Sequence, residues 1–285
     1  MGTSGSYSGG GGKPGKDLRR GVSDWLDSLP ASAPSSPSEP VVPPGTDGQP
    51  TPSAGDAGPS SGPHPLRPEV ALPVIGLFRP RSGGRTDGPG GGGGGGGRGG
   101  AGGGQTRSGG AQRSIAQSAA SAGRAAAAAY AYRTGDTETL RALGLDYDSL
   151  RATGDTIEIT QRIVEVACES SDGTIEGDER RLVAAAVALW VLEENQAGAP
   201  PEPDEIARHT LAEILFEAIS TETAALLRDG KRTTWATREG ERQMRQVAEA
   251  LAQRANLSTN GATAAEFERA IEQGLEALRS IRGDS

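Results

Sequence analysis

Alanine and other small residues predominate in residues 111–133, AQRSIAQSAASAGRAAAAAYAYR. Alanine has the highest helix propensity of the amino acids, so this stretch predicts a helix. Its small side chains would let a neighbouring helix approach closely, and Tyr130 and Tyr132 mark its end. The composition of the chain changes just before this helix, so the two sides are considered separately.

On the C-terminal side, apolar residues recur at helical spacing and no segment alternates convincingly as a strand. Residues 155–170, for example, carry Ile159 and Ile163 four positions apart. Helices are expected at 155–170, 176–196, 203–228, 237–257 and 263–281, with short helical turns at 137–151 that break at Gly144. We predict an all-α fold, a helical bundle of about six or seven helices over residues 111–285.

On the N-terminal side, residues 1–110 hold 32 of the 44 glycines and 16 of the 19 prolines. Such a composition is typical of low-complexity, disordered sequence that cannot bury a core. We therefore expect a flexible Gly/Ser tail over residues 1–12 and a disordered linker over residues 13–110. Two short apolar islands, at 22–30 and 70–80, interrupt this linker.

The first island, residues 22–30, has its apolar residues at i, i+3, i+4 and i+7, namely Val22, Trp25, Leu26 and Leu29. Ser23 is placed to cap a helical turn and Pro30 to end it. A single turn is not stable in water, so it should become ordered only against another surface. Tryptophan is a favoured interface residue, and we expect a partner protein to bind here. Packing on this chain's own domain is the alternative.

The second island, residues 70–80, contains Pro73 and Gly76, which argue against a helix. An extended segment that adds to a groove or a sheet edge is expected instead. Its apolar residues are assigned to partner binding, although packing on the home domain is equally open: Val74, Ile75, Leu77 and Phe78.

The net charge of -8 is distributed unevenly along the chain. Residues 1–110 carry ten Lys/Arg and eight Asp/Glu, whereas residues 111–285 carry nineteen and twenty-nine. An acidic folded domain is a poor match for a phosphate backbone. The exception is the Gly/Arg-rich segment 79–124, which contains seven arginines and a single acidic residue, Asp87. A non-specific nucleic-acid-binding scaffold acting through this segment is therefore an alternative function, although it has no aromatic side chain on which a base could stack.

Few residues offer catalytic or metal chemistry. The single cysteine, Cys168, excludes an intramolecular disulfide and is expected to be buried and structural. Of the two histidines, His64 and His209, the second is expected on the polar side of a helix, solvated or capping. The acidic run 172–179 fits a turn with a Thr174 cap better than a calcium loop. We expect no catalytic residue, no metal and no cofactor.

No apolar run approaches the length of a membrane span, and the N-terminus has no apolar signal-peptide core. A soluble cytoplasmic protein is expected. Enrichment in arginine, alanine and glycine suggests a GC-rich, bacterial genome, in which the formal match of the N-terminus to a myristoylation pattern would have no use.

The N-terminus itself, Met1-Gly2-Thr3-Ser4-Gly5-Ser6, is the strongest candidate for chemistry. Methionine is normally removed before glycine, which leaves a free α-amine with a pKa of about 7.7–8.0. The neutral fraction of such an amine is a nucleophile. Residues 2–12 are small apart from Tyr7, so they could enter a narrow active site, and fully extended they span roughly 37 Å. This pattern predicts a modification site at Gly2.

These pieces together resemble QatB, a component of the bacterial Qat anti-phage defence system. The resemblance covers most of the chain in layout and is carried by MGTSGSYSGG at 1–10, SDWLDSLP at 23–30, GGAQRSIAQSAASAGRAAAAAY at 109–130 and LGLD at 143–146. It implies a non-enzymatic protein that works with QatC, which is similar to QueC enzymes of 7-deazaguanine biosynthesis. The ATPase QatA and the TatD-like nuclease QatD are the other implied partners.

The resemblance also implies that Gly2 accepts a deazaguanine-type group and that Thr3, Ser4, Gly5 and Ser6 form the recognised tail. A coil of 108 linker residues would have a root-mean-square reach of roughly 55–60 Å. The helical domain could then stay docked elsewhere in an assembly while Gly2 visits the enzyme.

Overall fold

The computed structural model describes residues 13–29, 71–77, 110–168, 174–194, 198–227 and 233–280. These residues form ten α-helices, and no strand occurs within the same ranges, so the predicted all-α fold class is confirmed. The helices are α1 (Lys13–Asp27), α2 (Ala71–Leu77), α3 (Gly110–Thr134), α4 (Thr137–Ala142), α5 (Tyr147–Thr153), α6 (Thr156–Ala167), α7 (Ile175–Glu193), α8 (Pro203–Leu227), α9 (Thr234–Arg254) and α10 (Ala264–Ser280).

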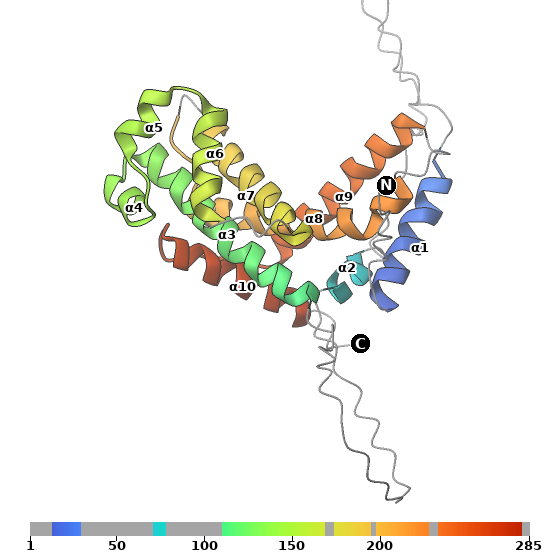
Figure 1. The fold of residues 1–285 in the computed structure, drawn as a ribbon. Coiled ribbons are helices and arrows are strands. Elements are labelled where there is room, and N and C mark those ends of the chain that lie inside the picture. The colour runs from blue at the N-terminus through green and yellow to red at the C-terminus, as the bar shows by residue number, and fades with distance from the viewer. Residues whose placement is uncertain are drawn as a thin grey trace, which may run out of the picture.

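The alanine-rich helix α3 lies at the centre of the bundle, where its main neighbours are α7 and α10 (Figure 1). Its five successive alanines, residues 125–129, are each at most 2% exposed. Side chains this small let helices pack closely on several sides of the same turn, which explains why α3 can be buried all round. The predicted close packing of residues 111–133 is therefore confirmed.

The closest approach to α3 is made by α10 at Gly123. A Cβ atom added there would lie 3.1 Å from the backbone nitrogen of Glu268 and 3.3 Å from the carbonyl oxygen of Ala264. Backbone atoms of a packed helix cannot turn aside as a flexible side chain can. Hydrogen in place of a methyl group at this position is therefore what allows the two helices to cross.

We expect Gly123→Ala to lower the free energy of unfolding by about 1–3 kcal/mol, because overpacking forces backbones apart. At an unhindered helix site the same change would stabilise the fold by about 1 kcal/mol through helix propensity. Urea denaturation of the variant and of the wild type measures the change in the free energy of unfolding. A variant more stable than the wild type would show that α3 and α10 separate without cost.

Aspartate caps divide the segment after α3 into short helices. The side chains of Asp136, Asp146 and Asp155 accept hydrogen bonds from backbone nitrogens at the starts of α4, α5 and α6, at 3.0, 2.8 and 2.9 Å. Gly144, with φ of 83°, turns the chain between α4 and α5. Residues 137–151 therefore form two helices, so the described residues between 110 and 280 contain eight helices, close to the expected six or seven.

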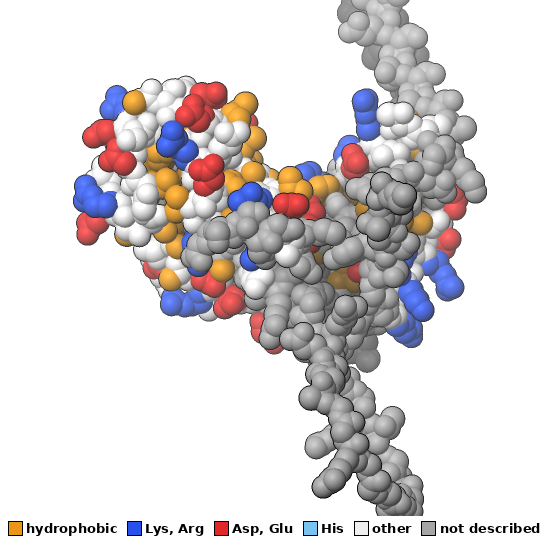
Figure 2. All heavy atoms as spheres, viewed as in Figure 1, with side chains coloured by type: hydrophobic (Ala, Val, Ile, Leu, Met, Phe, Trp, Pro, Cys, Tyr) orange, Lys and Arg blue, Asp and Glu red, His pale blue; other side chains and the backbone are white. Residues whose placement is uncertain are grey.

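The helices form a hollowed body. In Figure 1, α4, α5 and α6 stand on one side, α1 and α9 stand on the other, and α7 and α8 run between them. The space-filling view shows a hollow between the two sides, with hydrophobic side chains along its wall and floor (Figure 2). This hollow and the helix α1 are the two surfaces from which a functional site can be built.

Candidate functional site

Helix α1 is anchored on the helical body by one apolar face. Its side chains Leu18, Val22, Trp25 and Leu26 are all buried, with Trp25 the most exposed at 8%. The neighbours of α1 are α2, α8 and α9. Leu29, just beyond the helix, is half-buried against the same core.

The expectation that Val22, Trp25, Leu26 and Leu29 bind a partner protein is therefore wrong for this fold, and the intramolecular alternative is what the structure shows. The physical reason is that the amphipathic pattern starts earlier than expected. Leu18 extends the apolar face by a further turn, so that α1 runs from Lys13 to Asp27. Ser23, expected to cap the helix, lies inside it.

A glycine and an ion pair set the orientation of α1 on the body, which the apolar face holds in place. A Cβ atom on Gly240 of α9 would lie 3.1 Å from Leu227 and 3.2 Å from Leu26, so glycine makes room for the end of α1. Arg19 Nη1 lies 2.7 Å from Glu222 Oε2 of α8, and both side chains are less than a third exposed. The contacts of Leu26 with Gly240 and of Arg19 with Glu222 join residues more than 200 positions apart, and no sequence pattern pointed to them.

The second island is a helix, α2, and the expected extended conformation is wrong. Proline is tolerated in the first turn of a helix, where its missing N–H has no partner to lose, and Pro73 is the third residue of α2. Val74 and Ile75 are buried and Leu77 packs against the same core. These side chains are therefore covered by the chain itself, while Phe78 lies outside the described residues.

The linker boundaries change as a consequence. Residues 13–29 and 71–77 belong to the helical body, although they were expected in a linker over 13–110. The candidate modification site Gly2 and the tail residues Thr3, Ser4, Gly5 and Ser6 lie outside the described residues. Because Lys13 is fixed on the body, covalent geometry keeps Gly2 within roughly 37 Å of it. This limit replaces the longer reach expected for a 108-residue linker.

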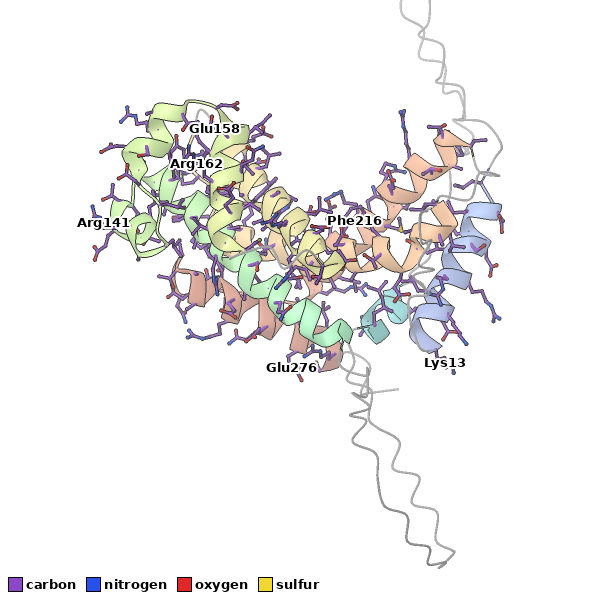
Figure 3. All side chains as sticks on the ribbon, viewed as in Figure 1. Lys13, Arg141, Glu158, Arg162, Phe216 and Glu276 are labelled. Carbon is purple, nitrogen blue, oxygen red and sulfur yellow. The ribbon has the colours of Figure 1, made fainter. Side chains whose placement is uncertain are left out.

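A second cluster of aromatic and charged side chains lies along α8, where α7 and α9 pack against it. The rings of Trp190 and His209 are stacked, with centroids 4.0 Å apart. Arg245 forms an ion pair with the buried carboxylate of Glu213 and places its guanidinium 4.2 Å from the centroid of the Phe216 ring. Phe216 lies at the floor of the hollow (Figure 3).

His209 is therefore not the solvated or capping residue expected from its polar neighbours, because only 23% of its side chain is exposed. Burial lowers the pKa of His209 to about 4, and the charge of Arg245 contributes to the same shift. Glu213 Oε1 is 3.7 Å from His209 Nε2, yet this carboxylate is already paired with Arg245. The alignment of α7 against α8 brings Trp190 and His209 together, and this alignment cannot be predicted from the spacing of residues in the sequence.

A cavity of about 250 Å³ opens between α3, α4 and α6. Its lining is apolar except for one arginine: Arg124, Ala128, Ala142, Leu143, Ile163, Val166 and Ala167. Cys168, next to this lining in the chain, is half-buried, and burial raises the pKa of its thiol. The cavity thus offers space without a nucleophile or a general base. Arg124 belongs to α3, so the Gly/Arg-rich segment 79–124 ends inside the folded body.

In the described part of the chain, no group of three or more His, Cys, Asp or Glu side chains is placed to hold a metal ion. The same residues include no helix that combines the length and the apolar character needed to cross a membrane. Thr174 caps α7 as expected, since its hydroxyl accepts a hydrogen bond from the Gly177 nitrogen at 3.0 Å.

No protein-family model, no curated protein and no solved structure matches this chain.

Proposed function

We propose that the chain is a non-enzymatic component of a Qat-type bacterial anti-phage defence system that presents its own N-terminal glycine to a QueC-like partner in the cytoplasm. The observation that carries the proposal is the anchoring of α1. Helix α1 begins at Lys13 and is anchored on the body, so the eleven residues from Gly2 to Gly12 are joined to a fixed point. A short, small-residue tail that starts on a rigid body is suited to delivering its end into another protein's active site.

The chemistry of the tail supports the same role. After removal of Met1, the amine of Gly2 has a pKa near 7.7–8.0, whereas a lysine amine has one near 10.4. At neutral pH the tail amine is therefore the best amine nucleophile nearby. Its nitrogen would form a bond to a carbon of a 7-deazaguanine-type group that the partner has activated. The nitrogen would lose a proton, and the activating group would leave with the electron pair of the broken bond.

The intact mass of the protein, co-expressed with the QueC-like enzyme and its precursor, tests the proposal. We expect loss of Met1 and one added mass of nucleobase size, which fragmentation places on Gly2. The control is Gly2→Glu, because methionine is retained before a large residue and no α-amine appears at position 2. An unmodified Gly2 beside an active partner would rule the proposal out, as would a mass found on Lys13 or Lys16.

The QatA-type ATPase and the QatD-type nuclease enter the proposal as further members of the assembly. Co-purification of each with the full chain, before and after modification of Gly2, is the direct measurement of whether they bind it.

A further inference from the structure

Among the side chains of α1 that the structure describes, each exposed one is charged, and their order opposes the helix dipole. At 3.6 residues per turn, six exposed side chains fall on one strip, which we call the charged strip: Lys13, Lys16, Asp17, Arg20, Asp24 and Asp27. Three of the first four are cations, with Asp17 among them, and the last two are acids. Helices favour the reverse, with acids in the first turn and cations in the last, and α1 has neither.

Figure 2 shows this separation: Lys and Arg side chains gather at one end of α1 and acidic side chains lie toward the other. Lys13 marks the cationic end in Figure 3. Since this order opposes the helix dipole, the dipole does not explain it. Sequences that break a local rule in this way tend to do so at functional surfaces.

The cations of the charged strip are also not used to hold the fold together. Among the described residues, Lys13, Lys16 and Arg20 form no ion pair, whereas Arg19, on the flank of α1, pairs with Glu222. The strip is about 21 Å long, from a rise of 1.5 Å per residue. It therefore runs along about four turns of one exposed helix face.

We infer that the charged strip is the docking surface for the protein that receives the N-terminal tail. The inference rests on the proposed function, because it assigns where the modifying partner binds. The partner is a protein with carboxylates opposite the Lys13 end of the strip and cations opposite the Asp27 end. A nucleic acid fits less well, since Asp17, Asp24 and Asp27 would face its phosphates.

The position of the strip suits this partner. The tail joins the strip at Lys13, so a protein seated on α1 has its tail-binding pocket within roughly 37 Å of the first docking contact. Docking and tail entry then act as two linked binding events, and the first raises the effective concentration of Gly2 at the pocket. Docking should accordingly lower KM and leave the chemical step unchanged.

The test is steady-state modification of the full chain by the QueC-like enzyme, with the triple variant Lys13→Glu/Lys16→Glu/Arg20→Glu. We expect KM to rise about tenfold with kcat unchanged, because the reversed charges repel the partner. Added salt should raise the KM of the wild type toward that of the variant by screening. Glutamates at the start of α1 favour the helix dipole but stand four positions from Asp17, Asp24 and each other, so hydrogen exchange over residues 13–27 checks that the variant keeps its helix.

The matched control is Arg141→Glu/Arg151→Glu/Arg162→Glu, which changes the net charge equally. These exposed residues lie on α4, α5 and α6, away from Lys13 (Figure 3). We expect its KM to stay within about twofold of the wild type.

The outcomes separate the two proposals. A wild-type chain that is never modified rejects the proposed function. A modified wild type with the same KM in the triple variant rejects the docking surface alone. An unchanged KM together with lost binding of a labelled single-stranded oligonucleotide would assign the charged strip to nucleic acid and overturn the inference.

Discussion

Replacing Trp25 with alanine is expected to release α1 from the helical body and leave α3–α10 folded. Removing a buried tryptophan side chain costs about 3–5 kcal/mol. The apolar face holds α1 on the body, and the Arg19–Glu222 ion pair, which is partly exposed, adds little to the free energy of unfolding. A free helix of fifteen residues with internal glycine and proline is not stable in water, so α1 should unfold once released.

Hydrogen exchange followed by mass spectrometry measures this release segment by segment. We expect protection to be lost over residues 13–29, and over α2 because it packs on α1, while α3 and α7 keep theirs. Trypsin should then cut at Arg19 and Arg20. The control is Asp24→Ala, which changes the exposed residue next to Trp25. Equal loss of protection throughout the chain would instead show that α1 is part of the same cooperative unit as α3.

The helices that could be predicted from the sequence are those whose pattern is local. Residues 155–170 and 263–281 repeat apolar side chains at helical spacing, and the structure has α6 and α10 there. The alanine-rich stretch gave α3 by propensity alone. Each of these signals lies within one helix, so no tertiary contact was needed to recognise it.

The elements that could not be predicted depend on distant contacts. Pro73 and Gly76 indicated an extended segment, yet burial of Val74 and Ile75 stabilises a helix in α2. The position of α1 depends on the absence of a side chain at Gly240. This absence matters only because α9 lies beside Leu26 in the folded chain. The same holds for the candidate site: the tail at Gly2 is visible in the sequence, but the anchor that sets its reach is not.

The second large effect is a dependence of stability on pH that arises at His209. The pKa of this residue is lowered from 6.5 to about 4 in the folded chain, mainly by burial and also by Arg245. Below pH 6.5 the unfolded chain therefore binds a proton that the folded chain does not. The contribution of His209 to stability is fully present above pH 6.5. It declines as the pH falls and is lost below about pH 4. Linkage gives a total loss of about 3 kcal/mol.

The variant His209→Gln removes this contribution, because it has no group that titrates in the window. Its absolute stability also changes through loss of the stack on Trp190, so the slopes between pH 6.5 and 4 are compared, not the values. We expect the free energy of unfolding, measured by urea denaturation, to fall more steeply with decreasing pH in the wild type than in His209→Gln. Parallel curves would mean that the folded pKa of His209 is ordinary.

An NMR titration examines the same residue directly. The chain has two histidines, so His64→Gln leaves His209 as the single imidazole. Its ring proton should shift near pH 4 with no change around 6.5. Replacing Arg245 by methionine removes one cation and frees the carboxylate of Glu213, which then lies 3.7 Å from the ring without its ion-pair partner. Both changes favour the protonated imidazole, so the pKa of His209 should rise in this variant. A pKa unmoved by Arg245→Met would show that burial alone sets it.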